Sequence, residues 1–265
     1  MIIRVLGCHG SELIVADGKG GAHECRTCGF LVNETCMVDA GSVSAGLREA
    51  EQGKIRHVLL SHAHFDHIKG LPMLADNLVG RAQKNGPVMI RALSEVLDVL
   101  RRHIFNDVVF PDFTRLPTVD SAPLAYHAFD EEKTFSLDKL EVTVVRVNHI
   151  VPAAGFIVRQ GGSALLYSGD TSETRRIWEV AAKEPRLKAA FIETSFPNDF
   201  RDLAKVSGHL TPEMFAREFV KLGRPDLPVY IYHLKPSYRH VIAAELKQLN
   251  LPNLRVLEED QVVRI

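Results

Sequence analysis

The sequence predicts an α/β protein in which two β-sheets pack together and helices cover them on the outside. Two observations support this prediction. Short runs rich in Val, Ile, Leu and aromatic residues recur along all 265 residues, and helical patterns separate many of them. The first third is rich in strands, whereas the end alternates strand and helix. A chain of this length with 46% hydrophobic residues can also bury a large core.

The expected strands are bounded by Gly, Pro, Asn or Asp. They cover 2–7, 12–17, 29–33, 36–41, 57–62, 87–93, 140–149, 155–160, 164–170, 189–196, 228–234 and 254–259. The expected helices cover 43–53, 67–79, 94–106, 174–184, 211–221 and 239–249. The helix at 211–221 has the clearest start, because Thr211 suits the N-cap and Pro212 the first helical position.

Composition and charge exclude several classes of protein. The net charge of −1 argues against a protein that works on nucleic acid, which usually carries a basic excess. The start "MIIRVLGCHG" has no signal-peptide pattern, and no run approaches the roughly 18 apolar residues of a membrane span. Four cysteines do not form a disulfide framework in a chain this long. We therefore expect a cytoplasmic protein with reduced thiols, folded as one domain over 1–265.

Residues able to bind metal are concentrated in the stretch "LLSHAHFDHIKGLP". It contains His62, His64, Asp66 and His67 directly after an expected strand. Three further residues of these types each end a later strand, where loops begin and binding residues concentrate. They are His149, Asp170 and His233. Imidazole nitrogens and carboxylate oxygens bind zinc, manganese and iron. Seven such groups exceed the needs of one tetrahedral ion and suit two ions with a bridging carboxylate.

A single His or Asp at the end of a strand is usually a turn residue or a polar group with an ordinary partner. We interpret four other histidines in that way, as structural or surface residues. They are His57, His103, His127 and His240. The segment Cys25-x-x-Cys28, with His23 nearby, has the spacing of half a zinc site, but no second such pair follows. Ordinary thiols at the start of a buried strand are therefore expected there.

The motif "HAHFDH", with its downstream partners, resembles the His-x-His-x-Asp-His signature of the metallo-β-lactamase superfamily. That resemblance implies a four-layer αβ/βα sandwich with two metals at one edge of the paired sheets. It implies that His62, His64 and His149 hold one ion, that Asp66, His67 and His233 hold the other, and that Asp170 bridges them. Two ions in such a site share a water molecule and lower its pKa toward neutrality.

Two later segments, "FIETSFPND" and "SGHLTP", resemble the phosphodiesterase branch of this superfamily. They contain Glu193 and His209. Hydrolysis of a phosphodiester releases a poor alkoxide leaving group, and a positioned acid speeds this step by about 10²–10⁴-fold. The resemblance implies that His209 is this acid and that Glu193 orients it, so Asp66, Glu193 and His209 are the expected catalytic group. The alternative is that Glu193 caps a loop and His209 only precedes a helix.

Within that branch, the chain resembles class II cyclic-nucleotide phosphodiesterases more than the transfer-RNA 3′-processing endonucleases. "GHLTP" and "HLKP" fit the first pattern better, and no long basic arm rich in Gly and Pro is present. Lys235 of "HLKP" is then a candidate for binding the substrate anion. "RRHIFNDVVFPDFTRL" resembles an insertion of that family, which we place at about 80–120 as a helical insertion near the active site. There Phe110 either stacks on a base or packs in the core.

The resemblance therefore predicts hydrolysis of 3′,5′-cyclic nucleotides to 5′-nucleotides by a homodimer. The cofactors would be two divalent ions, zinc or manganese, with iron or magnesium as further options. The family usually has Leu at the position of Phe65, which leaves the nucleotide open. Three alternatives remain: a transfer-RNA-processing or general nuclease, a non-catalytic nucleotide-binding sensor, and a lactone or thioester hydrolase. In a lactone or thioester hydrolase, Glu193 and His209 would have no evident role.

Overall fold

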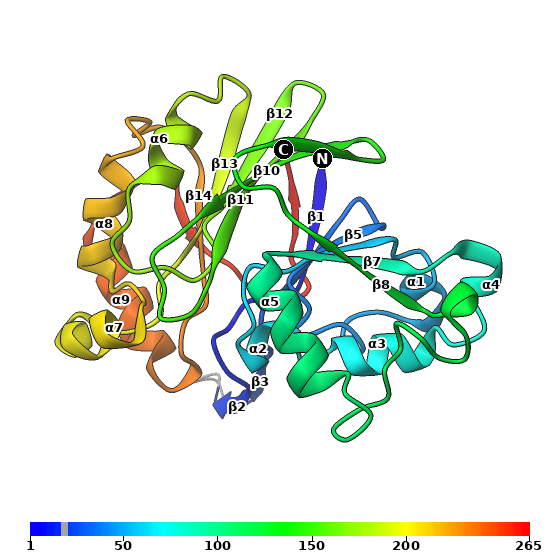
Figure 1. Cartoon of the computed structure of the whole chain (residues 1–265). Helices are drawn as coiled ribbons and strands as arrows, with labels where there is room; N and C mark the ends of the chain where they lie inside the picture. The colour runs from blue at the N-terminus through cyan, green and yellow to red at the C-terminus, as the bar shows by residue number, and fades with distance from the viewer. Residues whose placement is uncertain (17–20) are drawn as a thin grey trace.

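The computed structural model describes residues 1–16 and 21–265, and within these ranges it contains two seven-stranded sheets. The sheets lie side by side in the centre of the molecule, and helices flank each of them on the outside (Figure 1). The predicted arrangement of two sheets between helical layers is confirmed.

The first sheet combines antiparallel strands from the N-terminal region with parallel strands, in the order β16-β1-β4-β5-β6-β7-β8. Its strands are β1 (Ile2–Gly7), β4 (Gly29–Val32), β5 (Cys36–Val38), β6 (His57–Leu59), β7 (Val88–Ala92), β8 (Leu124–Ala128) and β16 (Val262–Arg264). The helices of this half are α1 (Glu49–Gln52), α2 (Phe65–Ile68), α3 (Leu71–Asn77), α4 (Ala82–Asn85) and α5 (Ser94–Val99), which continues into a π-helical turn, Leu100–Ile104. The stretch 80–120 thus includes β7, a strand paired on both sides.

The second sheet has the order β15-β14-β13-β12-β11-β10-β9, with parallel pairing from β12 to β15. Its strands are β9 (Thr134–Leu137), β10 (Leu140–Arg146), β11 (Ala154–Gln160), β12 (Ser163–Tyr167), β13 (Leu187–Glu193), β14 (Val229–Tyr232) and β15 (Leu254–Val256). Its helices are α6 (Arg176–Ala182), α7 (Arg201–Ser207), α8 (Pro212–Val220) and α9 (Arg239–Gln248). A separate hairpin joins β2 (Leu13–Ala16) to β3 (Ala22–Cys25).

Aromatic side chains fill the space between the two sheets. Phe30 of the first sheet packs edge-to-face on three rings of the second, Tyr167, Phe191 and Tyr232, with centroid distances of 5.5–5.6 Å. A second apolar core, which includes Trp178 and Phe215, lies between the second sheet and its helices. Burial of large aromatics contributes heavily to stability, so the two sheets are held firmly against each other.

Several predicted element boundaries were wrong. The helix expected at 43–53 forms only at Glu49–Gln52, and the one expected at 67–79 is interrupted at Gly70. A Cβ at Gly70 would lie 2.6 Å from the carbonyl oxygen of Ala40, so the chain passes close to β5 there. The prediction also missed α7 and four short strands, β3, β8, β9 and β16. Asp17, the last residue of the strand expected at 12–17, lies outside the described residues.

The N-cap at the start of α8 is as predicted: the Thr211 hydroxyl accepts a hydrogen bond from the Met214 amide, and Pro212 occupies the first turn. Among the described residues, no helix has both the length and the apolar composition needed to cross a bilayer.

Candidate metal centre and active site

The seven predicted metal ligands come together at one edge of the paired sheets. His62 and His64 follow β6, and His64 is the N-cap of α2, whose first turn presents Asp66 and His67. The other three residues follow strands β10, β12 and β14 of the second sheet; they are His149, Asp170 and His233. Strand ends from both sheets therefore supply one site.

The first group of ligands is formed by His62, His64 and His149, whose candidate ligand nitrogens lie within 4.8 Å of one another. Nδ1 of His64 is 3.2 Å from Nε2 of His149. The other nitrogen of His149, Nδ1, donates to the carbonyl oxygen of Gly208 at 2.8 Å. This bond fixes the tautomer and leaves Nε2 of His149 free to bind an ion.

The second group surrounds Asp170, which is fully buried. Oδ2 of Asp170 lies 3.2 Å from Nε2 of His67, 3.1 Å from Nε2 of His233 and 3.6 Å from Nε2 of His62. Oδ2 of Asp66 is 3.2 Å from the same nitrogen of His233. Asp170 thus contacts members of both groups, which is the position that a bridging carboxylate requires.

Four buried atoms at this point have no hydrogen-bond partner: Nε2 of His62, Nε2 of His67 and both carboxylate oxygens of Asp170. Each buried polar atom without a partner costs about 1–3 kcal/mol. Divalent cations placed among these atoms would satisfy all four, and the mixture of imidazole and carboxylate suits zinc or manganese. The residues present therefore fit a two-ion centre.

The electrostatics of the site keep four of its ligands in metal-binding form; at His67, although burial opposes it, the carboxylates of Asp170 and Asp39 raise the pKa above the ordinary value. Burial lowers the pKa of His62, and it lowers the pKa of His64 to about 4, so both rings stay neutral. Although burial opposes it, the surrounding imidazoles hold the pKa of Asp66 and Asp170 below the ordinary value of a carboxyl group. Both carboxylates are therefore ionised at neutral pH.

Asp39, just after β5, supports the site and was not predicted. Its carboxylate accepts hydrogen bonds from Nδ1 of His67 at 2.8 Å, from the hydroxyl of Tyr167 at 2.6 Å and from the amide and hydroxyl of Ser61 at 2.7 and 2.8 Å. The carboxylate therefore directs Nε2 of His67 toward Asp170. The segment "MVDAG" shows in the sequence that Asp39 stands at the end of a strand. It does not show the partner of Asp39, because His67 is 28 positions further along the chain.

Glu193 and His209 form a buried pair beside the metal ligands. Nδ1 of His209 donates to Oε1 of Glu193 at 2.8 Å. The His209 ring stacks on that of His233 and lies edge-on to that of His149, with both centroid distances 5.1 Å. His209 therefore lies between the two groups of ligands, with its Nδ1 occupied by Glu193.

Ser195 connects this pair to the metal site and was also missed. Its hydroxyl donates to Oε2 of Glu193 at 3.0 Å and lies 2.7 Å from Nδ1 of His233. Burial acts to lower the pKa of His209, but the neighbouring Glu193 carboxylate raises it above its ordinary value. The ring is thereby stabilised in its protonated form.

A hollow of about 450 Å³ opens beside Asp66, and Phe65, Lys69 and Lys235 line it. Phe65 is 66% exposed, so its ring is accessible from the hollow. Lys69 pairs with Glu12, and the Lys235 ammonium donates to the carbonyl oxygen of Gly10 at 2.6 Å. The hollow is large enough for a small organic anion.

Phe110 packs against Phe105 and Phe113, with centroid distances of 6.4 and 5.7 Å. These contacts correspond to the core-packing alternative, and base stacking by Phe110 stays a prediction. Phe65 is the aromatic side chain that lines the hollow.

Two sheets flanked by helices, with a His/Asp cluster at their strand ends, define a metallo-β-lactamase fold. A family model described as the beta-lactamase superfamily domain matches residues 37–231, more than half of the chain. The chain therefore belongs to the beta-lactamase superfamily, and the resemblance of its "HAHFDH" motif is confirmed.

Relatives and solved structures agree with this placement. A probable 3′,5′-cyclic-nucleotide phosphodiesterase of Yersinia pestis is 27% identical over 298 residues, covering 90% of this chain and 84% of that protein. The unliganded structure of yeast PDE1 aligns with a TM-score of 0.81 and 19% identity, covering 100% of this chain and 99% of that one. The short form of human tRNase Z aligns with a TM-score of 0.67 and 18% identity, with the same coverage. At these identities the two structures show a shared fold.

Proposed function

We propose that this chain is a phosphodiesterase that opens 3′,5′-cyclic nucleotides to 5′-nucleotides with two divalent ions. The observation that carries the proposal is the Glu193–His209 pair, because the His209 ring lies against His149 of one ligand group and against His233 of the other. The name of the Yersinia pestis relative supports the cyclic substrate.

His62, His64 and His149 would hold one ion, and Asp66, His67 and His233 the other, with Asp170 shared. When bound, the ions would polarise water for attack on phosphorus and offset charge on the phosphoryl oxygens. The attack breaks the bond from phosphorus to the 3′-oxygen, whose electron pair then takes the proton on Nε2 of His209. Glu193 holds the imidazolium through Nδ1 before this transfer, and the neutral ring is reprotonated from solvent.

The hollow beside Asp66 would hold the nucleoside. Phe65 offers an exposed ring for stacking on the base, and Lys235 lies beside the same hollow as a cation for the phosphate. A second hollow of about 340 Å³ shares Lys235 and includes Phe196, whose ring centroid is 5.9 Å from that of His209. Together the two hollows give a path from the base site to the proton donor.

The test is direct. The purified protein, loaded with Mn²⁺ or Zn²⁺, is incubated with a panel of cyclic nucleotides and with a transfer-RNA precursor, and the products are identified by chromatography. Release of 5′-nucleotides from a cyclic substrate supports the proposal. Cleavage of the RNA alone would favour the processing-nuclease alternative, and binding without turnover would favour the sensor. Light scattering on the same sample checks the expected homodimer.

A further inference from the structure

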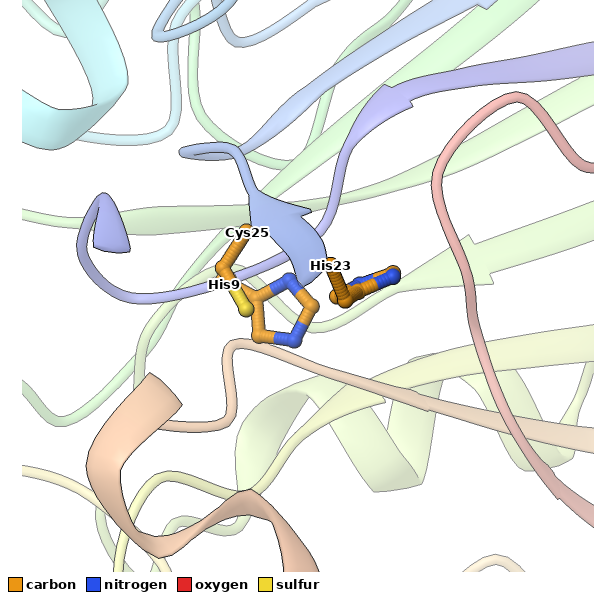
Figure 2. A group of neighbouring side chains, drawn as sticks. All are labelled: His9, His23 and Cys25. Atoms are coloured by element: carbon orange, nitrogen blue, oxygen red, sulfur yellow. The ribbon is translucent and has the colours of Figure 1, made fainter. Parts of the chain in front are cut away.

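A second cluster of metal-binding side chains lies outside the two-ion centre. It consists of His9, His23, Cys25 and Glu259, and we call it the N-terminal cluster. Figure 2 shows the Cys25 sulfur directed toward the His9 ring, with His23 on the same strand as Cys25. One candidate ligand atom from each of His9, His23 and Cys25 lies within 4.8 Å of the other two. The reaction proposed above uses none of these residues.

The local structure brings these side chains together around Glu259. His23 and Cys25 are two positions apart on β3, so both project from the same face of the hairpin. Glu259, in the loop after β15, accepts a hydrogen bond from Nδ1 of His9 at 2.7 Å on one oxygen and from Nε2 of His23 at 3.0 Å on the other. Three segments far apart in the sequence therefore meet at a single carboxylate.

The cluster is shielded from water. Cys25 is 1% and His9 5% exposed, and the side chain of Glu259 is 6% exposed, whereas that of His23 is 30% exposed. Ligand atoms that share a tetrahedral zinc ion at 2.0–2.3 Å lie about 3.3–3.6 Å from one another. The ligand atoms of His9, His23 and Cys25 already lie within 4.8 Å of one another and reach that arrangement through small rotations of the side chains, and Glu259 already contacts both imidazoles. The donor set of two imidazoles, one thiolate and one carboxylate suits zinc.

We propose that His9, His23, Cys25 and Glu259 bind a third divalent transition-metal ion of the zinc type, with a structural role. The ion would fasten the β2–β3 hairpin and the C-terminal segment to the loop at residues 8–11. That loop contacts the catalytic edge: the His233 amide donates to the carbonyl oxygen of Cys8 at 2.6 Å, and the Gly10 amide to that of Leu234 at 3.2 Å. The third ion would therefore hold the backbone beside a ligand of the active site.

Two cysteines of the same Cys-x-x-Cys segment give a matched comparison. Cys28 belongs to a different group, with its sulfur near His67 and His233 rather than in the N-terminal cluster. The full-length protein is loaded with Co²⁺, and the thiolate-to-cobalt charge-transfer band is recorded together with the metal content of each chain. We expect three ions and a band in the unmodified protein. Cys25→Ser should remove one ion and the band, whereas Cys28→Ser should retain the band.

His64→Ala separates the two centres, since it should weaken the two-ion site and leave the thiolate band. His23→Gln serves as a second variant, because a partly exposed side chain can change without loss of the fold. Added Zn²⁺ should raise the melting temperature of His64→Ala, and this rise should be clearly smaller when His23→Gln is combined with it. A cobalt-loaded protein with no thiolate band, or a band lost in Cys28→Ser and kept in Cys25→Ser, would overturn the proposal. These readouts do not depend on the reaction.

Discussion

Replacing Glu193 by Gln tests whether this side chain acts through His209. Glu193 is fully buried, and Oε1 accepts from Nδ1 of His209 and from the Thr171 amide at 3.2 Å. The amide oxygen of Gln can keep both bonds. Its amide nitrogen can face the Ser195 hydroxyl, which can accept as well as donate. Glu193→Gln thus preserves the shape of the side chain and the bonds at Oε1; it removes the negative charge beside the imidazole and the 3.4 Å bond that Oε2 accepts from the Leu210 amide.

The size of the effect follows from that lost charge. A hydrogen bond to a charged group contributes about 1.5–3 kcal/mol, which corresponds to a fall in kcat of roughly 10- to 150-fold. Removal of the proton donor itself in His209→Gln should cost about 10²–10⁴-fold. Because the two residues act as one unit, the double variant should be no slower than His209→Gln by more than a small factor. KM and metal content should stay close to those of the unmodified protein.

The assay compares two leaving groups. A cyclic nucleotide releases an alkoxide, which needs a proton, whereas a nitrophenyl phosphodiester releases a stable anion that does not. Both variants should therefore lose far more activity on the cyclic nucleotide than on the nitrophenyl ester. Equal losses on the two substrates would refute proton donation by His209, and a loss of bound metal in Glu193→Gln would show that the pair only supports the ligands.

Other predictions concern metal binding, substrate binding and stability. His64→Ala should abolish activity through metal loss, and Asp39→Asn should weaken metal binding by about 10- to 100-fold, both read from metal content against a chelator series. Phe65→Ala should raise KM for a purine substrate by about 5- to 150-fold, because it removes about 1–3 kcal/mol of stacking on the base. Phe110→Ala should leave KM unchanged. The opposite pattern would assign stacking to Phe110. Glu184→Gln should reduce the free energy of unfolding at neutral pH by about 3–5 kcal/mol, because it leaves a buried guanidinium unpaired.

The same Glu184 gives a pH prediction with a defined sign. Burial acts to raise its pKa, but the hydrogen bond from Arg159 lowers it below the ordinary value of Glu. A carboxyl with a lowered pKa contributes stability that is present above its unfolded pKa of about 4.3 and is lost as the pH falls through the folded value. Urea unfolding below about pH 4 should therefore show a shallower loss of stability in Glu184→Gln than in the unmodified protein. Parallel curves for the two proteins would contradict this.

The sequence predicted the fold class and the convergence of seven metal-type residues, because strand ends and loop starts are visible as local patterns. It could not predict Asp39 or Ser195 as supports, since His67 and His233, the ligands that they contact, lie 28 and 38 positions away and become their neighbours only when the chain folds. The N-terminal cluster was hidden for the same reason. His9 and Glu259 are 250 positions apart. The structure also places Cys25 and Cys28, which have the spacing of half a zinc site, in two different groups of side chains.

Gly208 limits which substitutions the active site can tolerate. Its carbonyl oxygen orients His149, its φ of +76° suits glycine, and the next residue is His209. A Cβ at this position would lie 2.6 Å from Nδ1 of His149. The position of Gly208 thus links His149, a proposed metal ligand, to His209, the proposed proton donor, so a change of backbone here would move both side chains. We therefore expect adaptation to new substrates to take place at the rim of the hollow, where Phe65 is exposed.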